Sequence, residues 1–325
     1  MEVLGELTTE DLERLPRADG QEINRSVEGW RHRLAEDGAS HDVLAAIDEY
    51  VALPRRDRSS VAALLNRYSN EAPAQTAVVF LWGGARGNNP TLAVCGQPRL
   101  SEDAGIPWLD DDSDRRRVAH EFLWDPLRAW DGEARPSPVE PRLAFQKLWT
   151  RQDWSKGLLK GCGTAFGTKI LYWAVRAHLG IHPAAERPVP LIYDARVFAS
   201  LMRRGPGSVR GFEQTWTHPQ SKVFSDAYEA YCNYAYDSAE RLNQLARQLN
   251  IDANFLAEDI ERWHFDLGSA EPDPPVAGDH DDASYGGGPE EIEPDSDLPA
   301  DYVVHQEQTV DRVLRSLAQA AERYG

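Results

Sequence analysis

The stretch Leu159-Lys-Gly-Cys-Gly-Thr-Ala-Phe-Gly-Thr-Lys-Ile-Leu-Tyr-Trp-Ala174, followed by Pro190-Leu-Ile-Tyr-Asp-Ala-Arg-Val-Phe198, decides the fold. Gly161 and Gly163 permit a tight turn, and apolar residues then recur at helical spacing. A Gly-x-Gly turn that leads into a helix presents free backbone N–H groups at the positive end of the helix dipole. The sequence therefore predicts a phosphate-binding turn, with Thr164 as the cap of the helix that follows.

This helix is expected to have an apolar face against a core and a second face that carries an amine among aromatic rings. The second face, at positions i, i+3, i+4 and i+7, comprises Lys169, Tyr172, Trp173 and Arg176. Aromatic neighbours would partly desolvate the Lys169 amine, which disfavours the ammonium form and makes the amine usable as a nucleophile. Asp194 follows an apolar run and is expected to cap the next helix. Considered separately, Lys169 is explained as a solvated surface charge and Asp194 as a structural helix cap, with no role in catalysis.

The combination resembles a known family, the helix–hairpin–helix DNA glycosylases, in particular the 8-oxoguanine DNA glycosylase branch and its reduced bacterial forms. The matching residues, within about residues 155–204, are Gly161, Gly163 and Thr164 at the hairpin, Thr168-Lys169 on the helix, and Asp194. The resemblance implies that the hairpin and the threonines contact the DNA backbone. It also implies that Lys169 attacks the sugar carbon that bears the base, while Asp194 supports the charge that develops on the sugar.

The spacing departs from the family pattern. In the family the Thr-Lys pair directly follows the hairpin glycines, whereas Thr168-Lys169 comes four residues after Thr164, about one helical turn. Either the hairpin is remodelled or the true register uses Gly167-Thr168-Lys169. The interval from Lys169 to Asp194 is also long, and residues 180–188 are the expected inserted loop.

Charge is distributed very unevenly along the 325 residues, whose formal net charge is -18. Residues 270–302 contain eleven Asp and Glu and no Lys or Arg, with little that is apolar, so we expect a disordered linker. Residues 151–225 contain eleven Lys and Arg against four acidic residues. The basic stretch is thus the one that holds the motif, as contact with a polyanion requires. The linker could be a solvating spacer or a DNA mimic that covers this basic stretch.

Further contacts are expected from arginine and tryptophan side chains. Guanidinium groups that would hold phosphates without reading sequence are Arg196, Arg203 and Arg210. Indole rings that could line a pocket for the extruded base are Trp82, Trp173 and Trp216, although aromatic spacing in helices more often marks a core. The turn-rich segment 83–90 is either a ligand-approaching loop or an ordinary connection.

Elsewhere the sequence predicts a mostly α-helical fold. Helical periodicity covers residues 8–15, 27–34, 43–51, 59–68, 114–130, 138–149, 225–249, 252–265 and 310–324. The short apolar run 77–82 fits a strand or a helix. We expect an N-terminal mostly helical region over 1–150, a helix–hairpin–helix catalytic region over 151–268, the linker over 269–302, and a C-terminal helix over 303–325 that docks back on the body.

The composition also limits the cofactors and the cellular location. Three cysteines, Cys95, Cys162 and Cys232, are too few and too scattered for a disulfide framework, a zinc site or a four-cysteine iron–sulfur cluster. We expect no metal and no other cofactor. The N-terminus lacks the pattern of a signal peptide, and the longest apolar run is too short to cross a bilayer. A cytoplasmic monomer that acts on double-stranded DNA is therefore expected.

The resemblance predicts a DNA N-glycosylase, a hydrolase that flips out and excises a modified or damaged base and leaves an abasic site, with or without strand cleavage as an AP lyase. Oxidised guanine is the family's best-known substrate. Net negative charge disfavours a scanner of the whole genome, so a bulky modified base, such as a glucosylated pyrimidine of phage DNA met in anti-phage defence, is the preferred substrate. The alternative from another class is a DNA-binding module without catalysis. A third reading is a protein that binds a cationic partner through the acidic linker.

Overall fold

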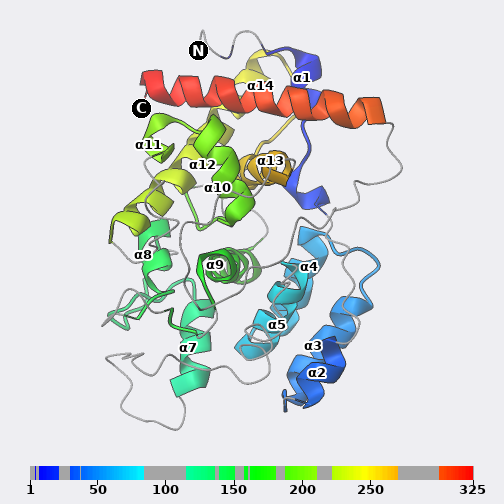
Figure 1. The fold of residues 1–325 in the computed structure, drawn as a ribbon, viewed down its shortest axis with the longest axis vertical. Coiled ribbons are helices and arrows are strands. Elements are labelled where there is room, and N and C mark those ends of the chain that lie inside the picture. Colours follow the sequence, from blue (N-terminus) through cyan, green and yellow to red (C-terminus); the bar gives the residue numbers. More distant parts are fainter. Residues whose placement is uncertain are drawn as a thin grey trace, which may run out of the picture.

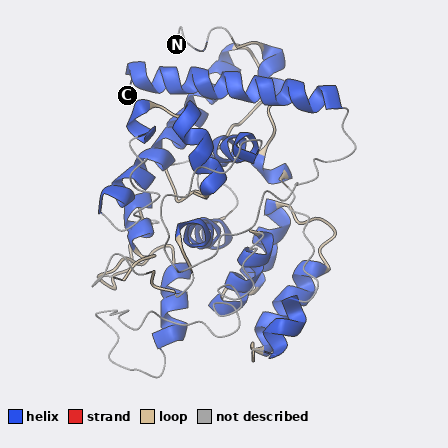
Figure 2. Ribbon diagram, in the orientation of Figure 1, coloured by secondary structure: helices blue, strands red, loops and turns tan. Residues whose placement is uncertain are grey.

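The computed structural model describes residues 4, 7–21, 30–36, 38–83, 115–135, 139–150, 157–159, 162–180, 187–210, 222–269 and 300–324. Within these residues the chain is mostly α-helical, as predicted, and contains two isolated antiparallel bridges but no β-strand (Figure 2). The acidic linker lies outside the described residues, except for the start of the last helix. Among the described residues, no helix is both long and apolar enough to cross a membrane.

The helices follow one another along the chain with bounds close to the predicted ones. In order they are α1 (Thr9–Glu13), the 3-10 helix η2 (Ala18–Gly20), α2 (Trp30–Glu36), α3 (His41–Val51), α4 (Arg58–Arg67), α5 (Ala72–Trp82), α7 (Arg115–Trp124), α8 (Pro141–Gln146), α9 (Thr164–Leu179), α10 (Ala195–Arg204), α11 (Gly207–Arg210), α12 (Lys222–Gln248), α13 (Ala257–Ser269) and α14 (Ala300–Tyr324). The helix predicted over 114–130 ends at Trp124, before Pro126, whose ring is incompatible with a helix interior.

Helix α9 occupies the centre of the molecule, with α4 and α5 on one side and α7 and α8 on the other (Figure 1). Every residue from Gly167 to Ala177 is buried. The apolar face predicted to meet a core is therefore covered, and so is the face that carries Lys169. A helix enclosed on all sides holds its side chains in fixed places, which suits a site built on it.

The ambiguous run 77–82 is helical, as the second half of α5. Pro73 occupies the first turn of this helix, where its missing N–H costs nothing, and almost every later residue is buried. The apolar character that suggested a strand instead reflects a helix covered on all sides by α3, α7 and α9. Helix α5 brings Phe80 and Trp82 against α9, with the Phe80 ring 4.6 Å from that of Phe166 and the Trp82 ring 5.0 Å from that of Trp173.

Helices α10 and α13 cross at very short range. A Cβ atom on Gly268 would lie 2.1 Å from the carbonyl oxygen of Arg196, so only glycine allows this approach. A hydrogen bond of 2.9 Å joins Ser200 Oγ on α10 to His264 Nδ1 on α13. This crossing fixes the N-terminal end of α10 relative to the body of the protein.

We expect His264 to make the protein less stable in mild acid. Burial lowers the pKa of the ring to about 3, and the nearby positive charge of Arg204 adds to this. Because the unfolded chain takes up a proton below about pH 6.5 that the folded chain refuses, the free energy of unfolding falls between about pH 6.5 and pH 3, by up to ~1.4 kcal/mol per pH unit. Urea denaturation at a series of pH values measures this slope.

The slope should be smaller in His264→Gln, which cannot be protonated. His41→Gln, which replaces a ring whose side chain is 94% exposed, is the matched control and should give a curve parallel to that of the wild type. Equal slopes in His264→Gln and wild type would show that another group causes the acid sensitivity.

The C-terminal helix docks on the body, as predicted, but it is longer than the predicted 310–324 and begins at Ala300. It lies across α10, α12 and α13 at one end of the molecule (Figure 1). Its apolar face, which includes Val313, Leu314 and Leu317, is fully buried. At its rim Arg204 Nε donates to Asp311 Oδ1 at 2.5 Å, and Arg312 pairs with Asp11.

Candidate active site

Lys169 and Asp194 come together at the start of α10. Lys169 Nζ lies 3.3 Å from Asp194 Oδ2, and the two side chains are 8% and 12% exposed. The Lys169 amine also lies over the ring of Phe166, 5.6 Å from its centre. The two residues that the family motif singled out are thus an ion pair, almost closed off from water, with one aromatic face beside the amine.

Asp194 holds its position because it caps α10. Its Oδ1 atom accepts hydrogen bonds from the backbone N–H groups of Arg196 at 3.1 Å and Val197 at 3.2 Å. The prediction that Asp194 is a helix cap is therefore confirmed. The two carboxylate oxygens have separate tasks, since one is bound to the helix terminus and the other faces Lys169.

A hydrogen bond between their neighbours fixes Lys169 relative to Asp194. The hydroxyl of Thr168 accepts the backbone N–H of Tyr193 at 3.0 Å and lies 2.9 Å from the carbonyl oxygen of Thr164, to which it can donate. Since Thr168 and Tyr193 each precede one member of the pair, this bond aligns the two backbones. Thr168 is fully buried, so we no longer expect it to contact DNA.

The turn before α9 is only partly described, because Gly161 lies outside the described residues. Gly163 caps α9 with extended backbone, and Thr164 is the first helical residue rather than the predicted cap. Gly167 lies inside the helix, where a Cβ atom would be 2.7 Å from Leu148 Cδ1, so it is not a turn glycine. The helix therefore begins five residues before Lys169 and leaves Thr164 half-buried at its N-terminus.

The structure describes two of the three tryptophans that were predicted to line a base pocket. Trp82 and Trp173 are buried and pack edge to face, 5.0 Å apart, so neither ring presents a face to solvent in this structure. Their indole nitrogens are buried and have no hydrogen-bond partner among the described residues, which is costly for a donor. Trp216 lies outside the described residues.

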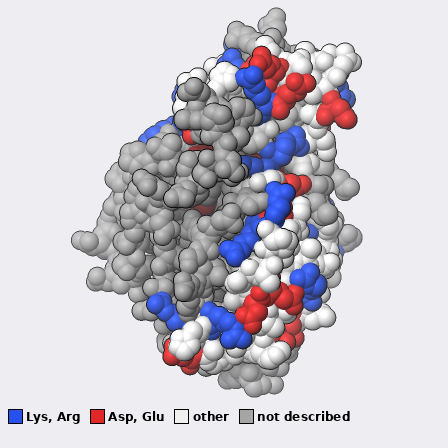
Figure 3. All heavy atoms as spheres, turned by 90° about the vertical axis from the view of Figure 1, so that its right-hand side faces the viewer, with Lys and Arg blue, Asp and Glu red and all other residues white. Residues whose placement is uncertain are grey.

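The three predicted phosphate-binding arginines follow one another along α10 and α11. Arg196 is half-buried with its guanidinium 5.0 Å from the centre of the Phe265 ring, whereas Arg203 is exposed. The side chain of Arg210 lies outside the described part of the chain. On the face drawn in Figure 3, basic and acidic side chains of the described residues are interspersed, so these residues by themselves do not form a patch of a single sign there.

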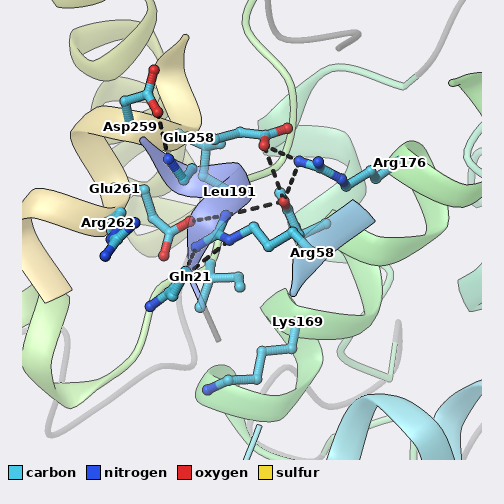
Figure 4. Close-up of polar contacts among 12 residues, drawn as sticks. Gln21, Arg58, Lys169, Arg176, Leu191, Glu258, Asp259, Glu261 and Arg262 are labelled. Atoms are coloured by element: carbon cyan, nitrogen blue, oxygen red, sulfur yellow. Dashed lines mark hydrogen bonds and ion pairs between the residues drawn. The ribbon is translucent and has the colours of Figure 1, made fainter. Parts of the chain in front are cut away.

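The sequence did not predict a buried polar network that lies near the Lys169–Asp194 pair. Tyr172 stands at its centre, and its hydroxyl accepts from Arg58 NH1 at 3.0 Å and from Arg176 NH1 at 2.8 Å (Figure 4). Arg58 also donates to Glu261 at 2.7 Å and to Gln21 at 2.6 Å. Glu258 completes the network through Tyr172 and Arg176.

This network binds η2, α4 and α13 to the helix that carries Lys169. Burial raises the pKa of Glu261, an effect that the charge of Arg58 partly offsets, and the carboxylate of Asp194 raises it further. Glu261 and Asp194 therefore lie within electrostatic reach of each other. Figure 4 shows the Lys169 side chain directed away from Arg58 and Arg176, although Lys169, Tyr172 and Arg176 share one face of α9 by their spacing. The signal in the sequence was the pairing of Tyr172 and Arg176 one helical turn apart.

The described fold and the Lys169–Asp194 contact can be compared with the family that the sequence resembles. A mostly helical body that holds a lysine and a helix-capping aspartate in contact, behind a glycine turn, has the arrangement implied by the helix–hairpin–helix DNA glycosylases. Residues 126–265 match the profile of a family described as "Putative 8-oxoguanine DNA glycosylase OGG-like protein", which confirms the predicted resemblance over that range. No curated protein and no solved structure gives a significant match.

The matched range contains Lys169 and Asp194 but excludes three segments that contact the site or its network. Arg58 and Gln21 belong to the network around Tyr172, and Gly83 lies against the Lys169 side chain. The N-terminal helices are therefore part of the candidate site, although they lie outside the range that resembles the family.

Proposed function

We propose that this protein is a DNA N-glycosylase that excises a modified base. The observation that carries the proposal is the 3.3 Å contact between Lys169 Nζ and Asp194 Oδ2, inside a range similar to the 8-oxoguanine DNA glycosylase family. Excision needs an anion beside a sugar that becomes cationic, and a group that attacks the sugar or positions water. A carboxylate and an amine in contact on rigid helices supply both.

In the proposed reaction the target nucleotide leaves the base stack, at a cost of a few kcal/mol that is smallest for damaged or poorly stacked bases. The bond between C1′ and the base then breaks. The electron pair leaves with the base, which takes up a proton, and the sugar gains positive charge. Asp194 lies where its Oδ2 atom can stabilise that charge, because Oδ1 is already bound to the terminus of α10.

Lys169 can act in two ways. As a neutral amine it forms a bond to C1′, loses a proton, and gives a Schiff base after ring opening, which leads to strand cleavage. Alternatively it holds the water that adds to C1′, and an abasic site remains. Borohydride reduces a Schiff base to a stable covalent link, so trapping distinguishes the two routes.

The DNA would be held at the N-terminus of α9 and along α10. Gly163 caps α9 and Thr164 is its first residue, and the N-terminus of a helix is a favourable place for a phosphate. We propose that Gly161, two residues earlier in the sequence, contributes to the same phosphate contact. Arg203 is exposed and, together with Arg196 and Arg210, would supply cations. Trp216 is kept as a proposed contact for the extruded base. Trp82 and Trp173 pack against each other inside the protein and would have to leave these positions before either ring could contact a base.

We propose a bulky modified base, such as a glucosylated pyrimidine of phage DNA, as the preferred substrate, with oxidised guanine as the alternative. The physical reason is the net charge of -18, which weakens long-range attraction to DNA and suits a target that is densely modified. The corresponding role is defence against phage by a monomer in the cytoplasm, rather than general repair.

The proposal is tested by mass spectrometry of free bases released from two DNAs, one oxidised and one from a phage with glucosylated cytosines. Wild type should release a base from one of them, and Asp194→Asn should release at least tenfold less. Asp57→Asn is the matched control, because Asp57 caps α4 in the same way, accepting from Ser60 N at 2.8 Å. If neither DNA loses a base, the glycosylase proposal is wrong.

Two observations favour the second candidate, a DNA-binding module without catalysis. The helix begins five residues before Lys169, and Thr168 is used inside the protein, both of which depart from the family's spacing. This alternative predicts that Asp194→Asn and Lys169→Gln bind duplex DNA like wild type, that none of the three releases a base, and that Arg203→Ala weakens binding.

A further inference from the structure

Gly83, the C-terminal cap of α5, lies directly against the side chain of Lys169. A Cβ atom at this position would be 2.8 Å from Lys169 Cδ, and 3.1 Å from both Lys169 Cε and the backbone carbonyl oxygen of Val79. The first distance is shorter than Cβ atoms in proteins show, so a side chain at position 83 would have to displace the lysine. The nearest atoms of the Lys169 stem thus occupy the space that any other residue at position 83 would fill.

The backbone at Gly83 does not itself require glycine. Its φ of -70° and ψ of -6° are ordinary right-handed values, which alanine adopts freely. Gly180, by contrast, has a φ of 103° and open space around it, so there the conformation calls for glycine. Since alanine at a right-handed helix end normally stabilises a protein, the glycine at position 83 is explained by its neighbour and not by its conformation.

The far end of the same lysine is held by different groups. Its Nζ atom lies 3.3 Å from Asp194 Oδ2 and over the ring of Phe166, which packs on Phe80 of α5. Helix α5 therefore contacts the stem directly through Gly83 and the amine indirectly through Phe166. The place of the amine relative to Asp194 depends on how closely the end of α5 approaches α9.

We propose that Gly83 is a positioning residue for Lys169. The missing side chain lets the lysine stem run past the end of α5 and places the amine on Asp194. This inference rests on the proposed function only where it concerns catalysis, since the contact itself can be tested by stability. It also assigns a role in the site to a residue outside the range similar to the glycosylase family.

The contact is tested by a double-mutant cycle of thermal stability, with wild type, Gly83→Ala, Lys169→Ala and the double variant. Gly83→Ala should lower the melting temperature when Lys169 is present. In the Lys169→Ala background, where Cδ and Cε are gone and the Val79 carbonyl oxygen remains, the same change should lower the melting temperature much less or raise it. Should Gly83→Ala alone fail to fold, recovery of folding in the double variant supports the contact. An equal effect in both backgrounds would overturn the inference.

The proposed effect of Gly83 on catalysis is tested on the DNA from which the wild type releases a base. Gly83→Ala should release base about tenfold more slowly or worse, since small displacements of a reacting group are costly, while its affinity for that DNA stays within about twofold of wild type. Gly20→Ala is the matched control, because a Cβ there meets nothing closer than 3.9 Å. A Gly83→Ala protein as active as wild type contradicts the inference. A wild type without activity contradicts the proposed function instead, and the stability cycle still decides the contact.

Discussion

Lys169→Gln is expected to reduce base release by roughly 10²–10⁴-fold, the range typical of a group that transfers protons in the transition state. Glutamine keeps the approximate length of the side chain and can still donate a hydrogen bond to Asp194, but it has no amine to attack C1′. Affinity for DNA should change little, because the Lys169 side chain is only 8% exposed and its amine pairs within the protein. Single-turnover release of the free base measures the rate, and borohydride trapping of the protein on DNA measures the covalent route.

Lys147→Gln is the control for the loss of a buried lysine. Lys147 is 1% exposed, donates to the carbonyl oxygen of Asp125 at 2.7 Å, and has its pKa lowered to about 7 by burial. Its replacement should leave the rate of base release near that of wild type. If Lys169→Gln retains full activity in a folded protein, Lys169 has no part in the chemistry. If activity falls but wild type is never trapped, Lys169 positions water instead of attacking the sugar.

Arg58→Ala is expected to lower the free energy of unfolding by about 3–5 kcal/mol, the cost of breaking a buried ion pair by removing one partner. Arg58 is fully buried and pairs with Glu261 at 2.7 Å, and its removal would leave that carboxylate at 1% exposure without its cation. The hydroxyl of Tyr172 and the amide of Gln21 would lose a donor as well. Urea denaturation followed by circular dichroism gives the difference directly.

Arg67→Ala is the matched comparison. Arg67 pairs with Glu49 at a similar distance, 2.6 Å, but the two side chains are 55% and 45% exposed. Water and salt screen such a pair, so its loss should cost less than about 1 kcal/mol. Comparable losses in Arg58→Ala and Arg67→Ala would mean that the buried network contributes no more than a surface pair.

A second substitution tests whether the cost comes from the unpaired charge. Removing the charge of Glu261 as well, in Arg58→Ala with Glu261→Gln, should restore part of the lost stability, because no buried carboxylate is then left without a cation. If the two changes are simply additive, Arg58 stabilises the protein through packing on Trp82 and Tyr172, whose rings its guanidinium approaches within 5.7 Å and 5.0 Å.

Features that depend on neighbours within about four residues could be predicted from the sequence. Thr8 caps α1 through Asp11, three residues away, and Asp194 caps α10 through Arg196 and Val197. Helix positions followed from apolar spacing in the same way, since a helix is held together by contacts of this range. Lys169 and Asp194 were placed together only by adding the family resemblance to these local signals.

Features that depend on which faces meet needed the tertiary structure. The run 77–82 is as apolar as a buried strand, so its sequence fits a strand or a buried helix equally well. The structure shows a helix whose faces are covered by α3, α7 and α9. Thr168 seemed available to DNA because nothing near it in sequence shows that Tyr193, 25 residues on, takes its hydroxyl. The bond from Arg58 to Glu261 joins residues 203 positions apart.

The sequence by itself therefore determined most of the helices, the cap at Asp194 and the chemical types of the two central residues, because these are set by local backbone and side-chain preferences. The cap of α9, which is Gly163 and not Thr164, was not determined in this way. Only the tertiary structure decided that Gly83 contacts Lys169, and that Arg58 is buried against Tyr172 on α9, the helix that carries Lys169. Such contacts depend on the packing of whole helices against one another, and the free energy of that packing is spread over many distant residues.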